Sequence, residues 1–111
     1  MRPRTLALTL ALLGAGLAAA GAAQEPPPNV KRIAEGRKLF IESGCHGCHT
    51  VGAMGTPIGP DLAHLGGKYP PDYLRRWLRD PAEQRPRAHM PKLELSEDQV
   101  QSLGAYLSSL R

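Results

Sequence analysis

Two thiols and an imidazole stand close together in the run Cys45-His46-Gly47-Cys48-His49, and they offer the richest chemistry in the chain. Cys45 and Cys48 are its only cysteines. On a helical turn, two thiols at this spacing share one face, and the residue after the second thiol lies on that same face. The motif can therefore hold one bound group through two sulfur atoms and one ring nitrogen.

Three common arrangements use cysteines at this spacing: a disulfide, a thioredoxin-like redox pair and half of a zinc site. A disulfide or a redox pair leaves His49 without a role, and the redox pair is typical of a βαβ setting, which needs strands. Zinc would need two of the four histidines as further ligands, and no histidine pair has the short spacing of a zinc finger. The four histidines are His46, His49, His64 and His89.

A C-x-x-C-H motif in an exported chain indicates covalent attachment of a c-type haem. Each thiol forms a thioether with one of the two vinyl groups of the porphyrin, and the histidine turns its imidazole toward the iron. We therefore predict one haem c, bound covalently through Cys45 and Cys48, with His49 as a ligand of its iron.

The sixth position of a haem iron decides between electron transfer and the binding of small molecules. Met90 is the favoured ligand, because it lies in a long loop and Pro91 restricts the backbone just beyond it. A thioether at this position raises the reduction potential. The alternative role for Met90 is apolar packing. The competing ligands are Met54, His64 and His89.

Residues 1–23 have the layout of a secretory signal peptide, with two arginines followed by an uncharged run of Leu, Ala and Gly. We expect cleavage after Ala23, and the alternative is an uncleaved membrane anchor. Residues 24–28 form a Pro-rich spacer, and 29–111 form one domain. The expected location is periplasmic or otherwise outside the cytoplasm.

The charge of the domain argues against nucleic acid as a partner. The formal net charge of the chain is +4 at pH 7, and two of its arginines belong to the expected leader, so the remaining domain is nearer neutral. Nucleic-acid binding needs a basic stripe rather than scattered charge. A domain of this size also has little interior, so we expect a covalent or metal brace in its core.

The spacing of apolar residues predicts three helices. They run from Asn29 to near Ser43-Gly44, from Pro71 to Asp80, and from Ser96 to the C-terminus. Asn29 is the expected N-cap of the first helix, and Ser96 with Gln99 forms a capping box for the last.

The segments between these helices are predicted as loops. Residues 50–60 and 66–69 are rich in glycine or proline, and residues 80–95 contain three prolines that argue against regular helix. No segment alternates apolar and polar residues as a strand would. The predicted fold class is therefore all-α.

With these residues in place, the chain resembles the class I monohaem cytochrome c family over nearly all of 29–111. The segments that carry the resemblance are Gly36 with Phe40, Cys45 to His49, Gly59-Pro60-Asp61-Leu62, Met90-Pro91 and Ala105-Tyr106-Leu107. The stretch between His49 and Met90 is short, so the chain resembles compact bacterial members rather than the mitochondrial type.

The resemblance implies a cytochrome c fold, in which three to four helices wrap one covalently attached haem and the first and last helices cross. It implies that Pro60 offers its carbonyl oxygen to the other ring nitrogen of His49. It also implies a small residue where the helices cross, a role for Gly36 with Gly104 opposite or nearby.

Two aromatic residues resemble those that wall the haem or reach a propionate in this family. They are Tyr69 and Trp77, and plain core packing is the alternative for Trp77. The resemblance also places docking at the exposed haem edge. The basic residues expected near the sixth-ligand side are Arg75, Arg76, Arg79, Arg85, Arg87 and Lys92. A solvated helix face is the alternative for any one of them.

The expected function is electron transport and not enzymatic catalysis. We expect a carrier of single electrons in a respiratory chain, with a dehydrogenase or membrane complex as donor and a terminal oxidase or reductase as acceptor. One alternative is the tightly bound haem subunit of a dehydrogenase, such as a sulfite dehydrogenase. Another is a haem enzyme or gas sensor with an open sixth position. A membrane is expected as a partner only if the leader is retained.

Overall fold

The structure is a computed structural model that describes residues 11–14, 16 and 28–111. The predicted signal peptide, 1–23, and spacer, 24–28, fall largely outside the described residues and stay predictions. No helix in the described part of the chain has both the length and the apolar character to cross a membrane.

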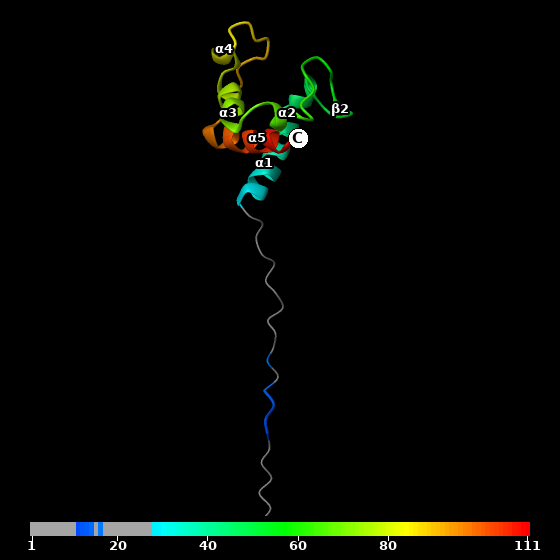
Figure 1. Cartoon of the computed structure of the whole chain (residues 1–111), viewed down its shortest axis with the longest axis vertical. Helices are drawn as coiled ribbons and strands as arrows, with labels where there is room; N and C mark the ends of the chain where they lie inside the picture. Colours follow the sequence, from blue (N-terminus) through cyan, green and yellow to red (C-terminus); the bar gives the residue numbers. More distant parts are fainter. Residues whose placement is uncertain (1–10, 15, 17–27) are drawn as a thin grey trace, which may run out of the picture.

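The domain consists of helices joined by short turns and one small hairpin (Figure 1). In chain order the elements are α1 (Pro28–Glu42), the 3-10 helix η1 (Cys45–Gly47), β1 (Thr50–Val51), β2 (Met54–Gly55), α2 (Leu65–Lys68), α3 (Pro71–Arg79), α4 (Pro81–Gln84) and α5 (Glu97–Ser109). The three predicted helices correspond to α1, α3 and α5, so the all-α class is confirmed. The capping box of α5 is also present, with Ser96 and Gln99 each accepting a backbone hydrogen bond from the other.

Two local predictions about helix boundaries are wrong. Asn29 is not an N-cap, because α1 begins at Pro28, and the fixed φ of proline suits the first residue of a helix. The segment 80–95 is not entirely loop, because Pro81 begins the one-turn helix α4. Proline is tolerated there because its missing N–H has no partner in a first turn, and Asp80 caps the turn by accepting from the Glu83 N–H.

Two predicted loops also contain regular structure. The segment 66–69 lies mostly within the one-turn helix α2. The segment 50–60 contains the antiparallel hairpin of β1 and β2, in which Thr50 pairs with Gly55 and Val51 with Met54. Each strand has two residues, which is too short to show any alternation in the sequence.

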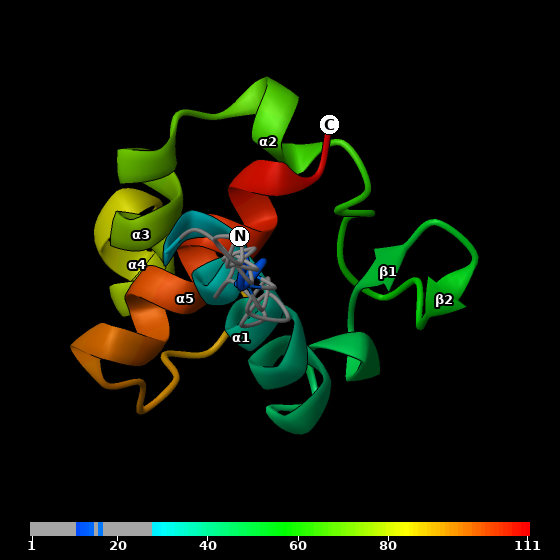
Figure 2. The ribbon, with the colours of Figure 1, turned by 90° about the horizontal axis from the view of Figure 1, so that it is seen from below.

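Helices α1 and α5 cross, and the other elements pack around this pair. Helix α1 packs across α5, and α2 and α3 also pack on α5. Figures 1 and 2 both show α3 and α4 on one side of α5 and the β1–β2 hairpin on the other. The hairpin that follows η1 and the α3–α4 segment therefore lie on opposite sides of α5.

The crossing of α1 and α5 depends on Gly36. A Cβ atom at this position would lie 1.9 Å from the carbonyl oxygen of Ser102 and 2.7 Å from the Cβ of Tyr106. Only a residue without a side chain permits this approach. The expected partnership with Gly104 is wrong, because Gly104 faces α3, where a Cβ would lie 2.8 Å from Cγ of Arg75.

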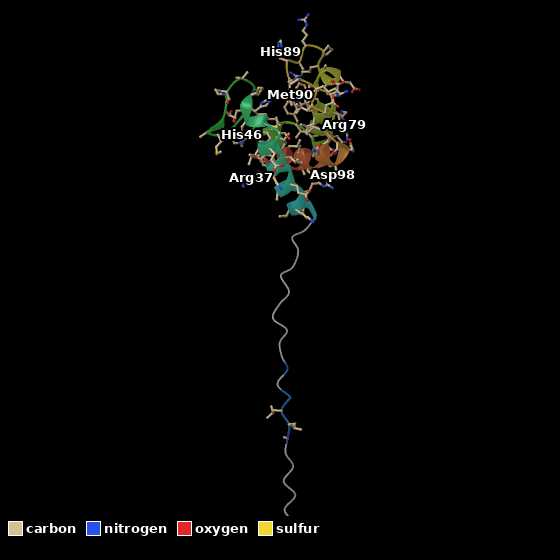
Figure 3. The ribbon with its side chains drawn as sticks, turned by 180° about the vertical axis from the view of Figure 1, so that it is seen from behind. Arg37, His46, Arg79, His89, Met90 and Asp98 are labelled. Atoms are coloured by element: carbon tan, nitrogen blue, oxygen red, sulfur yellow. The ribbon has the colours of Figure 1, made fainter. Side chains whose placement is uncertain are left out.

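Ion pairs join α5 to α1 and to α3. Arg32 of α1 lies 3.2 Å from the carboxylate of Asp98, and Arg79 of α3 donates through Nε to Glu97 at 3.0 Å (Figure 3 labels Asp98 and Arg79). The hydrogen bond from Arg79, followed by one from Gln101, lowers the pKa of Glu97 to about 2. These side chains are well exposed, so each pair adds little to the stability of the domain.

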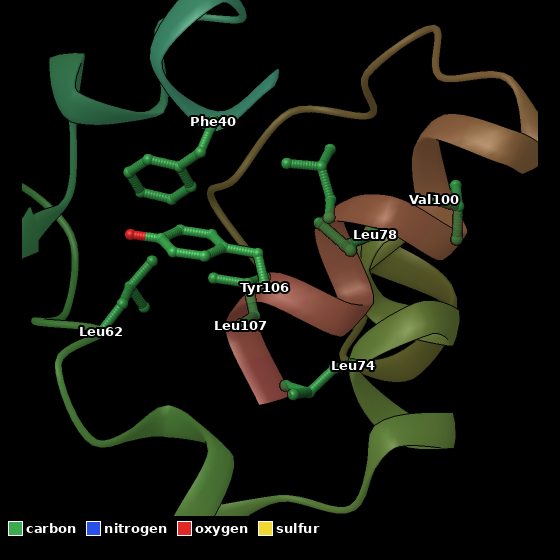
Figure 4. Close-up of a cluster of buried hydrophobic side chains, with 8 residues drawn as sticks. Phe40, Leu62, Leu74, Leu78, Val100, Tyr106 and Leu107 are labelled. Atoms are coloured by element: carbon green, nitrogen blue, oxygen red, sulfur yellow. The ribbon is translucent and has the colours of Figure 1, made fainter. Parts of the chain in front are cut away.

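The core lies where α1, α3 and α5 meet (Figure 4). Its buried side chains are Phe40, Leu62, Leu74, Leu78, Val100, Leu103, Tyr106 and Leu107. The rings of Phe40 and Tyr106 meet edge to face, with centroids 5.5 Å apart. Leu62 is the one member outside the helices, and its burial ties the segment that follows Pro60 to α5.

The substitution Gly36→Ala tests the helix crossing. Alanine favours a helix by about 1 kcal/mol over glycine, but its Cβ would overlap the backbone of α5. We expect a net loss of roughly 2 kcal/mol in the free energy of unfolding of the haem-loaded protein, measured with a chemical denaturant. The control is Gly67→Ala, where no heavy atom lies within 4 Å of the added Cβ. Equal stability of the two variants would contradict this account of the crossing.

Candidate haem-binding site

The cysteine motif sits in a tight turn directly after α1. Gly44 has φ of 76°, a left-handed conformation that favours glycine, and it separates α1 from η1. The N–H groups of Cys48 and His49 both donate to the carbonyl oxygen of Cys45, at 3.2 and 3.0 Å. This turn holds both thiols and the imidazole in one short structural unit.

Neither cysteine is in a disulfide, so both sulfur atoms are available for other bonds. Cys45 is half-buried against the core, and this burial raises the pKa of its thiol, whereas Cys48 is exposed. Within 11–14, 16 and 28–111, no three side chains of His, Cys, Asp or Glu gather as a metal-binding group. The disulfide and zinc alternatives therefore gain no support from the arrangement of side chains.

The ring of His49 is oriented by a backbone carbonyl. Its Nδ1 lies 2.8 Å from the carbonyl oxygen of Pro60, the contact that the resemblance implies. A carbonyl oxygen only accepts, so Nδ1 is the donor, and in the neutral ring Nε2 then keeps its lone pair. This is the tautomer in which an imidazole binds a metal through Nε2.

The loop that supplies this carbonyl lies directly against the imidazole. A Cβ at Gly59 would lie 2.7 Å from Cε1 of His49, so a side chain there would push the ring away. The N–H groups of Ile58 and Gly59 both donate to the carbonyl oxygen of Cys48. The backbone of this loop is thus bound to the motif at the Cys48 carbonyl as well as at the imidazole.

Asp61 closes the same loop at its base. Its carboxylate accepts from the hydroxyl of Thr50 at 2.8 Å and from the N–H of Gly52 at 3.1 Å. The hydrogen bond from Thr50 is the largest cause of a lowered pKa for Asp61. The N–H of Leu62 donates to the Thr50 carbonyl, which joins the two ends of the loop. Residues 50 and 61 together hold Pro60 over His49.

Met90 is half-buried in the loop after α4, and its sulfur accepts a hydrogen bond from the indole N–H of Trp77 at 3.2 Å. In Figure 3 His89 and Met90 lie at the top of the folded part of the chain, and His46 lies below them. The competing ligands are more exposed: Met54 is 67% exposed, and His64 and His89 are also exposed.

The two predicted wall residues belong to a row of aromatic rings. Tyr69 stacks on Tyr73 with centroids 4.9 Å apart, and Tyr73 lies 6.3 Å from Trp77. Trp77 is half-buried, and it belongs neither to the buried core nor to the partly buried side chains packed on it. The role of Trp77 in the wall of the haem stays a prediction.

A family model described as Cytochrome c matches residues 33–111. The chain belongs to the cytochrome c family. Two curated relatives are each named cytochrome c oxidase subunit 2. The protein from Alkalihalophilus pseudofirmus (strain ATCC BAA-2126 / JCM 17055 / OF4) is 35% identical over 86 residues, and that from Bacillus sp. (strain PS3) is 32% identical over 96. Each match covers 69% of this chain but only 25% or 26% of the relative, so the chain spans about a quarter of these proteins.

As a member of the cytochrome c family, the protein carries covalently bound haem c with its iron and transfers electrons through it. The residues present fit this group. The two cysteines are not joined to each other, His49 is bound to Pro60 through Nδ1 and so leaves Nε2 for a metal, and a half-buried thioether lies in the loop after α4.

Sequence reasoning missed three features of this cytochrome c site. Thr50 and Asp61 brace the loop, and the only signal was their places next to His49 and Pro60. His46, considered above only as a zinc ligand, packs edge-on against Phe40 with centroids 4.8 Å apart and so joins the motif to α1. The contact of Trp77 with Met90 left no local signal in the sequence.

The substitution Gly59→Ala tests the contact between the loop and the imidazole. The added Cβ would displace the ring of His49 from the Pro60 carbonyl. We expect the haem-loaded cytochrome to lose about 1–3 kcal/mol in free energy of unfolding, and its Soret band to shift. The control is Ile58→Ala, the neighbouring side chain, which is 75% exposed. Identical spectra and stabilities for the two variants would refute the role given to Gly59.

Proposed function

We propose that this cytochrome c carries single electrons outside the cytoplasm, within a respiratory chain, and delivers them to a terminal oxidase. The observation that carries the proposal is the fixed ring of His49, whose Nδ1 is bound to Pro60 and whose Nε2 is left for a metal. The names of the two relatives, both cytochrome c oxidase subunits, support an oxidase as the acceptor.

The proposed roles of the site residues follow from their geometry. Cys45 and Cys48 would hold the haem through thioethers, and His49 Nε2 and Met90 Sδ would bind its iron. When bound, the haem supplies a one-electron couple. The Pro60 carbonyl keeps His49 in one orientation, and Trp77 keeps the sulfur of Met90 in place. Ligands held in this way move little between oxidation states, which suits electron transfer rather than catalysis.

Two aromatic residues contribute to the proposed haem pocket without binding the iron. Tyr69 and Trp77 belong to the row of rings on the α3 side, and we assign them to the wall of the haem pocket. Export through residues 1–23, with or without cleavage, is part of the proposal, because haem of this type is attached to exported chains.

The substitution Met90→Ala tests the proposed sixth ligand. The haem should stay attached, because both cysteines remain, but the weak near-infrared sulfur-to-iron band of the oxidised protein should vanish. Met54→Ala removes the other nearby thioether, which is exposed, and should keep the band. A band that persists in Met90→Ala shows that another group is the ligand.

The exposed basic side chains around the Met90 loop are the proposed docking surface. Among the six expected basic residues, Arg75 is paired with Asp72 and Arg79 with Glu97. Arg76, Arg85, Arg87 and Lys92 are exposed, and we propose that they attract an acidic surface of the acceptor. Attraction of this kind raises association rates and weakens with added salt.

Oxidation of the reduced protein by membranes of the source organism tests the function and the docking surface together. Arg85→Glu with Arg87→Glu should slow the reaction about tenfold at low ionic strength and much less at high ionic strength. The control is Lys31→Glu with Arg37→Glu on α1, which makes the same charge change on exposed residues. Failure of the membranes to oxidise the protein contradicts an oxidase as acceptor, and equal rates for the two variants contradict the docking surface.

The second candidate function is a tightly bound haem subunit of a larger oxidoreductase, either an oxidase or a dehydrogenase such as a sulfite dehydrogenase. The relatives favour the oxidase, since their names describe subunits rather than free carriers. Size-exclusion chromatography of native material discriminates the two. A free carrier elutes near the mass of its own chain, and a subunit elutes with its complex.

A further inference from the structure

The hydrogen bond from Trp77 to Met90 has an unusual chemical character. An indole N–H that leaves water normally finds a strong acceptor such as a carbonyl or carboxylate oxygen. Here the N–H points at a thioether sulfur, a weak acceptor, at 3.2 Å. Both side chains are half-buried, so this contact replaces part of the hydration that the N–H gives up.

Trp77 is well placed to hold the sulfur because α3 is firmly anchored. Leu74 and Leu78, on the same helix, are buried in the core against α5. Tyr73 lies one turn before Trp77, with ring centroids 6.3 Å apart. Met90, by contrast, belongs to a loop outside any helix or strand. The rigid partner in this pair is therefore the indole, and the sulfur takes its position from it.

Donation to a sulfur atom also changes what that sulfur can offer a metal. A thioether has two lone pairs, and a hydrogen bond to one of them draws electron density away from the sulfur. When the ligand donates less electron density, the oxidised, more highly charged state of the metal loses more stabilisation than the reduced state does. The reduction potential therefore rises. Hydrogen bonds from neighbouring groups are among the means by which proteins raise or lower a reduction potential in this way.

We propose that Trp77 is a positioning residue that holds the Met90 sulfur and, by donating its N–H to it, raises the reduction potential of this cytochrome. This inference rests on the proposed function, because it takes Met90 as a ligand of the iron. The residue acts through Met90 and does not itself touch the metal.

The experiment uses the fact that Trp77 is the only tryptophan in the sequence. A tryptophan-requiring expression strain can replace it with 3-(benzothiophen-3-yl)alanine, which keeps the shape of the side chain and substitutes sulfur for the N–H. Trp77→Phe is the encoded counterpart. The control is Tyr73→Phe, which keeps the neighbouring ring of the row and removes only its hydroxyl. The measurements are the midpoint potential and the near-infrared sulfur-to-iron band of the oxidised protein.

We expect the potential to fall in both Trp77 variants. The fall should correspond to a threefold to tenfold decrease in the equilibrium constant for reduction, and a tenfold decrease is about 59 mV for one electron. Tyr73→Phe should match the unmodified protein. An unchanged or higher potential in the benzothiophene variant, with the band retained, overturns the inference and leaves Met90 as the ligand. Loss of the band in the benzothiophene variant supports the positioning role. Absence of the band from the unmodified protein overturns both the proposed ligand and this inference.

Discussion

The hydrogen bond between Nδ1 of His49 and the carbonyl oxygen of Pro60 is the interaction on which the site depends. It fixes both the tautomer and the plane of the imidazole, because a carbonyl oxygen can only accept a hydrogen bond and Nδ1 must therefore carry the proton. A free histidine beside two cysteines could turn in several directions. With Nδ1 held, the ring presents Nε2, and the motif becomes a rigid three-point attachment rather than three separate reactive side chains.

Much of the domain serves to keep that carbonyl in place. The loop returns to the motif through hydrogen bonds to the Cys48 carbonyl and is closed by Thr50 and Asp61. Leu62 then inserts into the core beside Tyr106 (Figure 4), so the loop is tied to α5. Helix α5 is in turn held against α1 at Gly36. Thus a glycine remote from the motif helps determine the position of an oxygen atom next to His49.

The sequence predicted what depends on neighbours along the chain, and it failed where distant segments meet. The capping box at Ser96 and the apolar spacing of α5 are local, and they placed that helix correctly. Gly104 was expected at the α1 crossing, but it lies two residues from both Ser102 and Tyr106, on the opposite face of α5, and that face meets Arg75 of α3. The contact between Trp77 and Met90 depends on how a loop folds back on a helix, which no local pattern encodes.

The tautomer of His49 is the most direct test of the account. Nuclear magnetic resonance of the reduced, haem-loaded protein with nitrogen-15-labelled histidine distinguishes the two ring nitrogens by their couplings to the ring protons. We predict that Nδ1 of His49 carries a slowly exchanging proton and that Nε2 carries none. A proton on Nε2, with Nδ1 unprotonated, would contradict the account, because the Pro60 carbonyl could then no longer be what orients the ring.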